Sequence, residues 1–251
     1  MNEDIYDLTF ELEETYWWYI ARRRILLDQV NSILRALSLE TRPRILEYGC
    51  GTGMTLHCLS PIARVYGIDS SDKALAYCRR RGLPHLHKME IPDFADRSNP
   101  FGDPFDIILL LDVLEHIKEE RQILRGLRTW LKPGGYLLVS VPAFRFLWSG
   151  EDDVSHHLRR YTRKSLNRVL HESDWKVRRE SYFNFFLFPI QAGVIVGQRI
   201  LGSTSSERSN LRPLPRTLNA VLLKMMSMEK NILRFVNLPF GGSIFAITQP
   251  R

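Results

Sequence analysis

The chain has 251 residues, 44% of them apolar, and carries a formal net charge of +7. This apolar content is enough to build the buried core of one domain of doubly wound size with an added segment. Its three cysteines, Cys50, Cys58 and Cys78, form no CxxC pair, which argues against a zinc knuckle or a disulfide framework. The basic balance can attract nucleic acid, anionic lipid or an acidic substrate, but each arginine cluster alone is more simply explained by a solvated helix face.

The N-terminal segment starts with acidic residues and no apolar stretch, so we expect a cytoplasmic protein without a secretory signal or transit peptide. The aromatic run Tyr16 to Tyr19 then leads into a helical pattern marked by Ile25, Val30 and Ile33. Two adjacent tryptophans cannot both face one stripe of a helix. We therefore expect one to pack on the core and the other to cover a ligand, with ordinary core packing as the alternative.

A short apolar strand ends in Glu47 and runs into Gly49, Gly51 and Gly53. Glycines spaced two apart allow the backbone to turn sharply and to approach a ligand closely. The dinucleotide fingerprint needs its third glycine one residue later, at Met54, so a pyrophosphate ligand is disfavoured. A helix is expected to begin near Met54.

The second strand is expected over Ala63 to Asp69. Asp69 lies twenty residues beyond Gly49, at the end of this strand, where a carboxylate can accept both hydroxyls of a ribose. Alternatively, Asp69 caps the helix that starts near Ser70, and the two roles are compatible. A third, short strand is expected near His85 to Lys88.

Strands and helices continue to alternate along the rest of the chain. Phe105 to Leu111 is an uninterrupted apolar run, typical of a central strand that is buried on both faces. Further strands are expected at Tyr136–Val141, Trp175–Tyr182 and Ser243–Thr248, helices at Arg121–Leu131 and Lys164–Glu172, and a turn at Lys132–Gly135. This order predicts an α/β fold with a doubly wound, mostly parallel sheet.

About sixty residues separate the last two strands, too many for a hairpin connection. Proline and glutamine interrupt the apolar stretch Tyr182 to Leu201, so it does not predict a transmembrane span. A second helix, Leu218 to Val236, has a methionine-rich apolar face that suits either a varied hydrophobic ligand or the core beneath it. We expect this insertion to form a helical cap that faces the substrate.

Four features in this order resemble the class I S-adenosylmethionine (SAM) methyltransferases, a superfamily that includes the ubiquinone-pathway O-methyltransferases. They are the GxGxG loop, the acid that ends the second strand, the FDxxxxxDVLEH block at 105–116 and the LKPGG turn at 131–135. The resemblance covers about residues 42–181 and implies a seven-stranded Rossmann-like sheet whose last two strands pair antiparallel at the edge. The expected division is an N-terminal helical lid over 1–41 with Tyr16 to Tyr19 closing the site, a SAM-binding core over 42–183, a helical cap over 184–242 and a last edge strand over 243–251.

The resemblance places the glycine loop against the methionine half of SAM, with Glu47 beside its ammonium or sulfonium charge. The segment Met89 to Ile91 would border the adenine, and Asp69 would bind the ribose. The SAM-binding residues that the resemblance implies are Glu47, Gly49, Cys50, Gly51, Gly53, Asp69, Ser70, Glu90, Ile91 and Leu111.

The block Asp112 to His116 follows the fourth strand, at the carboxyl edge where doubly wound sheets bind ligands. Asp112 and Glu115 are three residues apart and His116 follows, so a first helical turn here is expected to bring the three side chains together. The block is similar to the ExxEH element of metal-dependent methyltransferases that act on the terminal ribose of small RNA, and of the ubiquinone-pathway enzymes. The similarity implies Mg²⁺ or another divalent cation, held by Asp112, Glu115, His116 and His157, that lowers the pKa of an acceptor hydroxyl. Aspartate here replaces the first glutamate of that element. Alternatively, Glu115 and His116 only cap a helix, and His116 or His157 acts as a general base without a metal.

These observations predict a SAM-dependent methyltransferase whose acceptor is a small amphipathic or lipid-like metabolite under the apolar cap, with oxygen as the preferred acceptor atom. One alternative is methylation of RNA or another nitrogen acceptor, using the arginine clusters and the aromatic run. Another is a catalytically silent SAM-fold module that binds a partner or a membrane surface through its cap. Peripheral contact with a membrane is compatible with the apolar cap, but a transmembrane span is not predicted.

Overall fold

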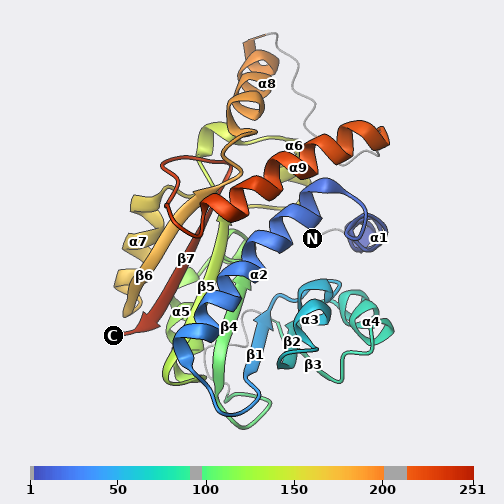
Figure 1. Ribbon diagram of the computed structural model, residues 1–251. Helices are drawn as coiled ribbons and strands as arrows, with labels where there is room; N and C mark the ends of the chain where they lie inside the picture. The colour runs from blue at the N-terminus through green and yellow to red at the C-terminus, as the bar shows by residue number, and fades with distance from the viewer. Residues whose placement is uncertain (1–2, 91–97, 201–213) are drawn as a thin grey trace.

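The computed structural model describes residues 3–90, 98–200 and 214–251, which build a single seven-stranded sheet (Figure 1). The strands are β1 Arg44–Tyr48, β2 Arg64–Asp69, β3 His85–Lys88, β4 Phe105–Leu111, β5 Leu131–Pro142, β6 Trp175–Phe183 and β7 Ser243–Pro250. Their order is β3-β2-β1-β4-β5-β7-β6, and β7 is antiparallel to both of its neighbours while the other pairs are parallel. The predicted doubly wound α/β sheet with an antiparallel edge is confirmed.

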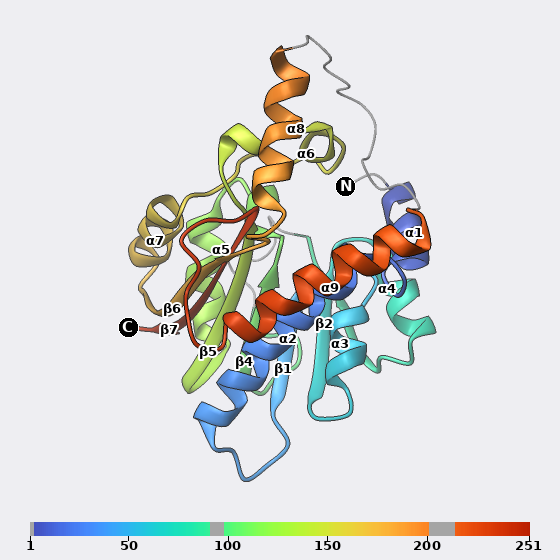
Figure 2. The same cartoon turned by 45° about the horizontal axis from the view of Figure 1, so that its top comes forward.

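Helices cover both faces of the sheet (Figures 1 and 2). They are α1 Glu3–Leu12, α2 Trp17–Leu37, α3 Met54–Leu59, α4 Asp72–Arg80, α5 Glu120–Thr129, α6 Gly150–Val154, α7 Arg163–Glu172, α8 Phe188–Ile200 and α9 Arg216–Ile232, with 3-10 turns η2 Leu114–His116 and η3 Arg145–Leu147. One buried cluster joins α2, α3, α4 and α9 to the sheet, and a second joins α5 and α7 to the other face. Because both faces are covered, the central strands are apolar throughout, as in β4, where every residue is buried.

The strand order reverses between β1 and β4. From β1 the chain winds outward to β2 and β3, and then returns through β4 to β5 on the other side. Loops after the carboxyl ends of β1 and β4 therefore diverge, and in such sheets ligands bind in the crevice at this point of reversal. The glycine loop follows β1 and the block Asp112 to His116 follows β4, so the two predicted motifs meet at this point.

Two local expectations were wrong. The helix expected through Leu131 ends at Thr129, because Leu131 already pairs with Phe105 and starts β5. The expected helical turn over Asp112 to His116 is instead a short 3-10 turn, and α5 begins only at Glu120. Asp112 has a positive φ of 55°, which takes it out of any helical turn with Glu115.

The two adjacent tryptophans both pack on the core. Trp17 and Trp18 are partly buried against the α2 side of the sheet, with their rings edge to face at 5.9 Å between centroids. The alternative of ordinary core packing therefore holds for both rings.

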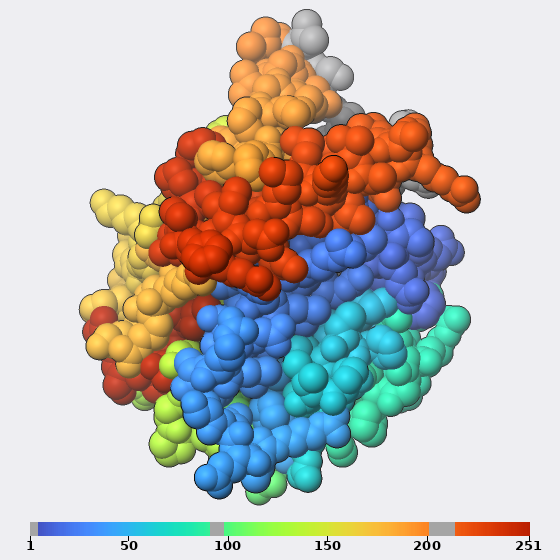
Figure 3. Space-filling view, viewed as in Figure 1, coloured from blue at the N-terminus to red at the C-terminus, as the bar shows by residue number. Residues whose placement is uncertain are grey.

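The two helices before β7 have different surroundings. α9 lies along α2, and Met226 and Leu233 fill the core beneath it, so its methionine face serves packing. α8 instead projects away from the body of the molecule (Figures 2 and 3). In the described part of the chain, no helix combines the length and the apolarity needed to cross a membrane.

Candidate functional site

The glycine loop is shaped by close packing on one side and open space on the other. Gly49 has a φ of 76°, and a Cβ there would lie 2.4 Å from Cγ2 of Val113, so only glycine fits between the two loops. Gly51 also has a positive φ, of 52°, yet a Cβ there would meet no atom of the described residues within 4 Å. The backbone at Gly51 therefore faces an opening that a ligand can enter.

Asp69 fastens this loop to the end of β2. Its carboxylate accepts hydrogen bonds from the backbone N–H groups of Gly51, at 2.8 Å, and Ser71, at 3.0 Å. The helix cap is supplied by Ser71, whose side chain accepts from the N–H of Ala74, so Asp69 is not the side chain that caps α4. Burial raises the pKa of Asp69, and the bonds from Ser71 and Gly51 oppose the rise.

Glu47 is a buried carboxylic acid at the end of β1. It is 4% exposed, and its Oε2 has no hydrogen-bond partner among the described residues. Burial raises its pKa to about 8, while the nearby Arg22 guanidinium lowers it. The side chain is therefore mostly neutral at pH 7 and would gain from a cation placed beside it.

The other expected cofactor residues have mixed surroundings. Leu111 is buried at the end of β4, and Cys50 is buried with its Sγ 3.8 Å from that of Cys78. Ser70 and Glu90 are exposed. Ile91 lies outside the described residues.

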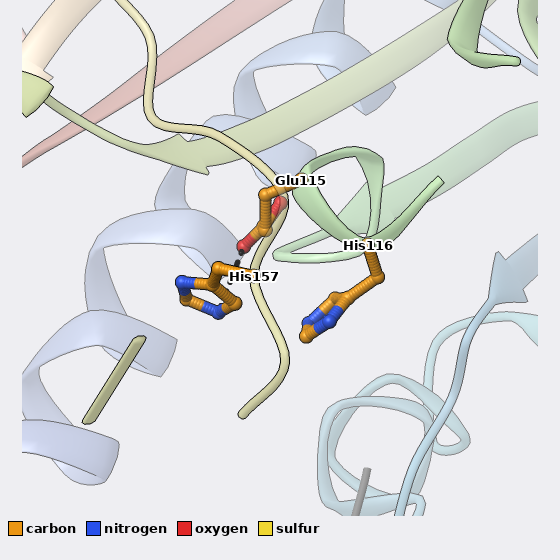
Figure 4. A group of neighbouring side chains, drawn as sticks. All are labelled: Glu115, His116 and His157. Carbon is orange, nitrogen blue, oxygen red and sulfur yellow. Dashed lines mark ion pairs between the residues drawn. The ribbon is translucent and has the colours of Figure 1, made fainter. Parts of the chain in front are cut away.

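A second group of side chains gathers after β4 and β5 (Figure 4). One donor atom from each of Glu115, His116 and His157 lies within 4.8 Å of the others. His157 Nε2 is 3.9 Å from Glu115 Oε1, and the two imidazole rings are 4.7 Å apart between centroids. The N–H of Leu158 donates to the Glu115 carbonyl, which holds the two loops together.

His157 is oriented by a buried carboxylate. Its Nδ1 lies 2.8 Å from Oδ1 of Asp152. The Arg160 guanidinium donates one hydrogen bond to each oxygen of this carboxylate. Burial opposes ionisation of Asp152, but the hydrogen bonds from His157 and Arg160 hold its pKa below its usual range. An ionised carboxylate on Nδ1 leaves Nε2 as the free nitrogen that faces Glu115.

The pKa shifts of the other two members favour their neutral forms. Glu115 is fully buried and neither of its oxygens has a hydrogen-bond partner among the described residues; burial, then Asp112, raises its pKa. Burial, then His157, lowers the pKa of His116 to about 4. Both shifts oppose a net charge on the side chain, and a cation placed beside Glu115 would offset its shift.

Asp112 does not join this group. Its Oδ2 forms an ion pair with Arg22 Nε at 2.7 Å, and its Oδ1 accepts from the Ser140 hydroxyl at 2.9 Å. The positive φ of Asp112 turns the side chain toward α2 and away from the direction that a helical turn would give it. The structure thus brings three of the four expected metal ligands together.

The Methyltransferase domain family matches residues 17–180, most of the chain, and the glycine loop, Asp69 and the block after β4 all lie within the match. This chain belongs to the class I SAM-dependent methyltransferases.

Several relatives support this membership. The ubiquinone biosynthesis O-methyltransferase of Albidiferax ferrireducens is 29% identical over 133 residues, 49% of this chain and 52% of the relative. Phosphoethanolamine N-methyltransferase 1 of Arabidopsis thaliana is 28% identical over 118 residues, 45% of this chain and 24% of the relative. A solved SAM-dependent methyltransferase from Clostridium acetobutylicum shares the fold with a TM-score of 0.54 at 11% identity over 92% of both chains. The chain spans about half the length of the first of these curated relatives.

Several residues near the site were not singled out by the sequence patterns, and the first of them comes from α2. Arg22 of α2 reaches the carboxyl edge of the sheet, where it contacts Asp112 and Ser140 and lowers the pKa of both Glu47 and Glu115. Arg22 belongs to the cluster Arg22 to Arg24, which the sequence alone explains more simply as a solvated helix face. Only the packing of α2 against β5 reveals that one member of the cluster points inward.

Helix α1 and the turn that follows it supply residues that lie against the glycine loop. Glu13 is buried, accepts a hydrogen bond from Thr52 of the loop at 2.7 Å and pairs with Arg81 at 2.6 Å. Tyr6 is also buried and interacts with Asp69, and burial followed by Asp69 raises its pKa. These contacts to the glycine loop thus come from residues that precede Tyr16 to Tyr19, the run that was expected to close the site.

Proposed function

We propose that this methyltransferase transfers the methyl group of SAM to an oxygen nucleophile on a small amphipathic metabolite, with His157 as the general base. The observation that carries the proposal is the pairing of His157 with Asp152 beside the crevice between β1 and β4. A hydroxyl group must lose a proton to become a good nucleophile, and an oriented imidazole is suited to remove it. The oxygen acceptor is also consistent with the relatives named as O-methyltransferases.

The proposed reaction moves one proton and one methyl group. The acceptor hydroxyl gives its proton to His157 Nε2, and its oxygen attacks the SAM methyl carbon as the carbon–sulfur bond breaks. The sulfonium becomes a neutral thioether, and the imidazolium that forms is stabilised by the ionised Asp152. Alignment of oxygen, methyl and sulfur away from water supplies much of the remaining acceleration.

We assign the two ends of SAM to the crevice on charge and hydrogen-bonding grounds. Glu47 matches the ammonium or sulfonium, and the Arg22 guanidinium matches the carboxylate of the methionine half. Asp69 is assigned to the ribose hydroxyls, next to the open side of Gly51. The segment 1–41 is assigned as the lid, with Tyr6 and Glu13 as its contacts to the site.

Replacing Glu47 with glutamine should stabilise the unliganded protein, and the gain should depend on pH. The folded pKa of Glu47 is about 8, whereas an unfolded glutamate has a pKa of about 4.3. Between these values the unfolded state is ionised and the folded state is not, so stability is lost as pH rises and the loss is complete above the folded pKa. Unliganded E47Q should therefore melt at a higher temperature than the wild type, and the difference should grow with pH.

Bound SAM should instead favour the ionised form of Glu47, because a cation beside the carboxylate stabilises its negative charge. The ratio of the SAM Kd of E47Q to that of the wild type should rise about tenfold between about pH 6 and about pH 8, measured calorimetrically. Taking the ratio removes the titration of SAM itself, which both proteins share. A ratio that stays constant over this range would contradict the assignment of Glu47.

Glu115, His116 and His157 are also a candidate metal site. Glu115 offers two unpartnered oxygens, and His157 has the carboxylate partner that metal-bound histidines usually have. Without Asp112, however, the set contains one carboxylate and two imidazoles, whereas Mg²⁺ prefers oxygen ligands. These residues fit Mg²⁺ poorly, and two imidazoles with one carboxylate suit Zn²⁺ or Fe²⁺ better. We assign proton removal to His157 without a metal.

Removal of divalent ions should therefore leave the activity in place. We expect kcat after dialysis against EDTA to stay within about twofold of the untreated enzyme, since an imidazole base needs no metal. The Glu115→Gln variant, tested for Mg²⁺ and Mn²⁺ binding by calorimetry beside the wild type, serves as the control. A loss that added Mg²⁺ restores in the wild type, together with Mg²⁺ binding that E115Q lacks, would return the metal to the mechanism.

The distribution of charge favours a metabolite over RNA as the acceptor. Several members of the arginine clusters form ion pairs within the protein: Arg81 with Glu13 and Glu14, Arg159 with Glu120, Arg160 with Asp152, and Arg163 with Glu180. Arginines held in this way have less charge to offer to phosphates. A binding affinity for oligonucleotides that falls steeply with salt would support the RNA alternative.

Labelled SAM tests the proposed reaction. The enzyme is incubated with methyl-labelled SAM and fractionated cell extract, and labelled products are identified by mass spectrometry. Label in an ether or ester of an amphipathic small molecule is the expected result. Label in RNA or on nitrogen would overturn the proposal, and stabilisation by SAM without transfer to any fraction would favour the silent module.

A further inference from the structure

Helix α8 exposes an apolar surface that leaves most of its residues outside the core of the described chain. Of its thirteen residues only Ile195 is buried, and it contains no acidic residue. Ile190, Val194 and Ile200 are 61%, 54% and 79% exposed. The helix stands out from the body in the space-filling view (Figure 3). A continuous apolar surface of this kind marks a site of interaction.

The base of α8 is firmly anchored. Buried Glu229 of α9 accepts hydrogen bonds from the N–H groups of Asn184, at 2.7 Å, and Phe186, at 2.9 Å, in the turn that precedes the helix. The ring of Phe188, in the first turn, contacts those of Phe144 and Phe240 at 5.6 and 5.3 Å between centroids. The apolar surface is thus held in place by the fold.

An arginine-rich cavity of about 750 Å³ lies beside this helix. Its lining consists of Arg145, Phe146, Trp148, Leu158, Arg159, Arg160 and Arg199, without an acidic residue. Two of these arginines form ion pairs, Arg159 with Glu120 and Arg160 with Asp152. Arg145 has no ion pair with a described residue, and the Arg199 guanidinium bonds only to the Trp148 carbonyl within that part of the chain. Within the described residues, the charges of Arg145 and Arg199 are therefore not balanced by a carboxylate and can attract an external anion.

We propose that α8 and this cavity, together the α8 surface, dock the enzyme on an anionic lipid bilayer. Arg145 and Arg199 bind lipid phosphates, and the exposed side chains of α8 enter the apolar layer beneath them. Phe146 and Leu158 are 44% and 53% exposed at the cavity, so apolar and basic groups adjoin, as they do in surfaces that bind membrane interfaces. Trp148 adds a side chain of a type enriched at that interface.

Charge argues against a second copy of the chain as the occupant. A two-fold symmetric contact through the α8 surface would bring Arg145 and Arg199 close to the same residues of the partner, and like charges at an interface are unfavourable. Neither α8 nor the cavity lining contains a carboxylate to offset them. A bilayer of anionic lipids offers negative charge to the arginines and an apolar layer to the exposed side chains of α8.

Docking would also orient the proposed active site. Leu158, Arg159 and Arg160 of the cavity lining directly follow His157 in the chain. The catalytic loop would therefore lie near the membrane surface, with access to an amphipathic acceptor dissolved there. Docking itself requires neither methyl transfer nor a lipid acceptor, so it can be tested apart from the proposed reaction.

Vesicle sedimentation tests the proposal on the full chain. The wild type is mixed with phosphatidylcholine vesicles, with or without about 30 mol% phosphatidylglycerol, and we expect at least about tenfold tighter binding to the anionic vesicles, falling as salt rises. V194Q/I200Q should lose most of this binding, and R145Q/R199Q should lose the preference for anionic lipid. The matched control L218Q/V221Q removes exposed apolar side chains of α9, 45% and 55% exposed, and should bind like the wild type. Unchanged thermal stabilisation by SAM verifies that each variant is folded.

Any of four results would overturn the proposal. The first two are absence of vesicle binding and equal binding to neutral and anionic vesicles. The third is a loss of binding in the α9 control equal to that in V194Q/I200Q. The fourth is complete release of the protein from vesicles by free phosphate or by a soluble short-chain lipid. Dimerisation that V194Q/I200Q abolishes, without vesicle binding, would assign the surface to a second copy instead. None of these measurements depends on catalysis, so failure of docking and failure of the proposed methyl transfer are distinguishable.

Discussion

Replacing Asp69 with alanine should weaken SAM binding at least about 100-fold, because each lost hydrogen bond to a charged group costs about 1.5–3 kcal/mol. The change removes the proposed acceptor of both ribose hydroxyls. It also removes the bonds that hold the N–H groups of Gly51 and Ser71, so the glycine loop loses its attachment to β2. Calorimetric titration with SAM and with its demethylated product measures the effect.

Asp72 provides a matched control three residues away. Its side chain is 75% exposed and, among the described residues, forms an ion pair with the surface residue Lys88, so D72A should bind SAM within about twofold of the wild type. An unchanged Kd in D69A, or equal weakening in both variants, would contradict the role assigned to Asp69. Thermal melting without ligand separates loss of binding from loss of fold.

Replacing His157 with alanine should lower kcat by about 10²- to 10⁴-fold, the usual contribution of a general base. SAM binding should stay within about twofold of the wild type, because His157 is assigned to the acceptor. The two effects are read from single-turnover methyl transfer and from calorimetry with the same protein. Loss of SAM binding with an unchanged rate at saturation would reverse the assignment.

His156 gives the control for this experiment. It is the adjacent, exposed histidine and has a φ of 56°, a conformation that asparagine tolerates well. H156N should therefore keep full activity. If H157A were as active as H156N on the identified acceptor, the general base would have to be sought elsewhere, and His116 would be the next variant to test.

The sheet was predictable because its signals are local and repeated. The expected ranges overlapped all seven strands, and the family resemblance implied that the last two strands pair antiparallel. The segment 243–251 was wrong as the edge strand, because β7 lies between β5 and β6 and β6 forms the edge. Glycine spacing also predicted the loop correctly, since positive φ at Gly49 and Gly51 is a backbone property that few other residues share. The boundary of β5 was missed because its pairing with Phe105 is a tertiary contact.

Side chains brought in from distant segments could not be predicted in the same way. Arg22, Glu13 and Tyr6 reach the crevice only because α1 and α2 pack where they do, and Asp152 meets His157 across a turn. The expected quartet of metal ligands assumed a helical turn, which the positive φ of Asp112 breaks. Local spacing identifies candidate ligands, whereas backbone conformation decides which of them converge.

A crystal structure of the complex with the demethylated product of SAM tests the central claim most directly. The account predicts the ribose hydroxyls on Asp69, the methionine carboxylate near Arg22 and the ammonium group near Glu47, with the sulfur facing His157. Electron density for the ligand at any other place, or a crevice that stays empty at saturating ligand while the loop keeps its shape, would contradict it.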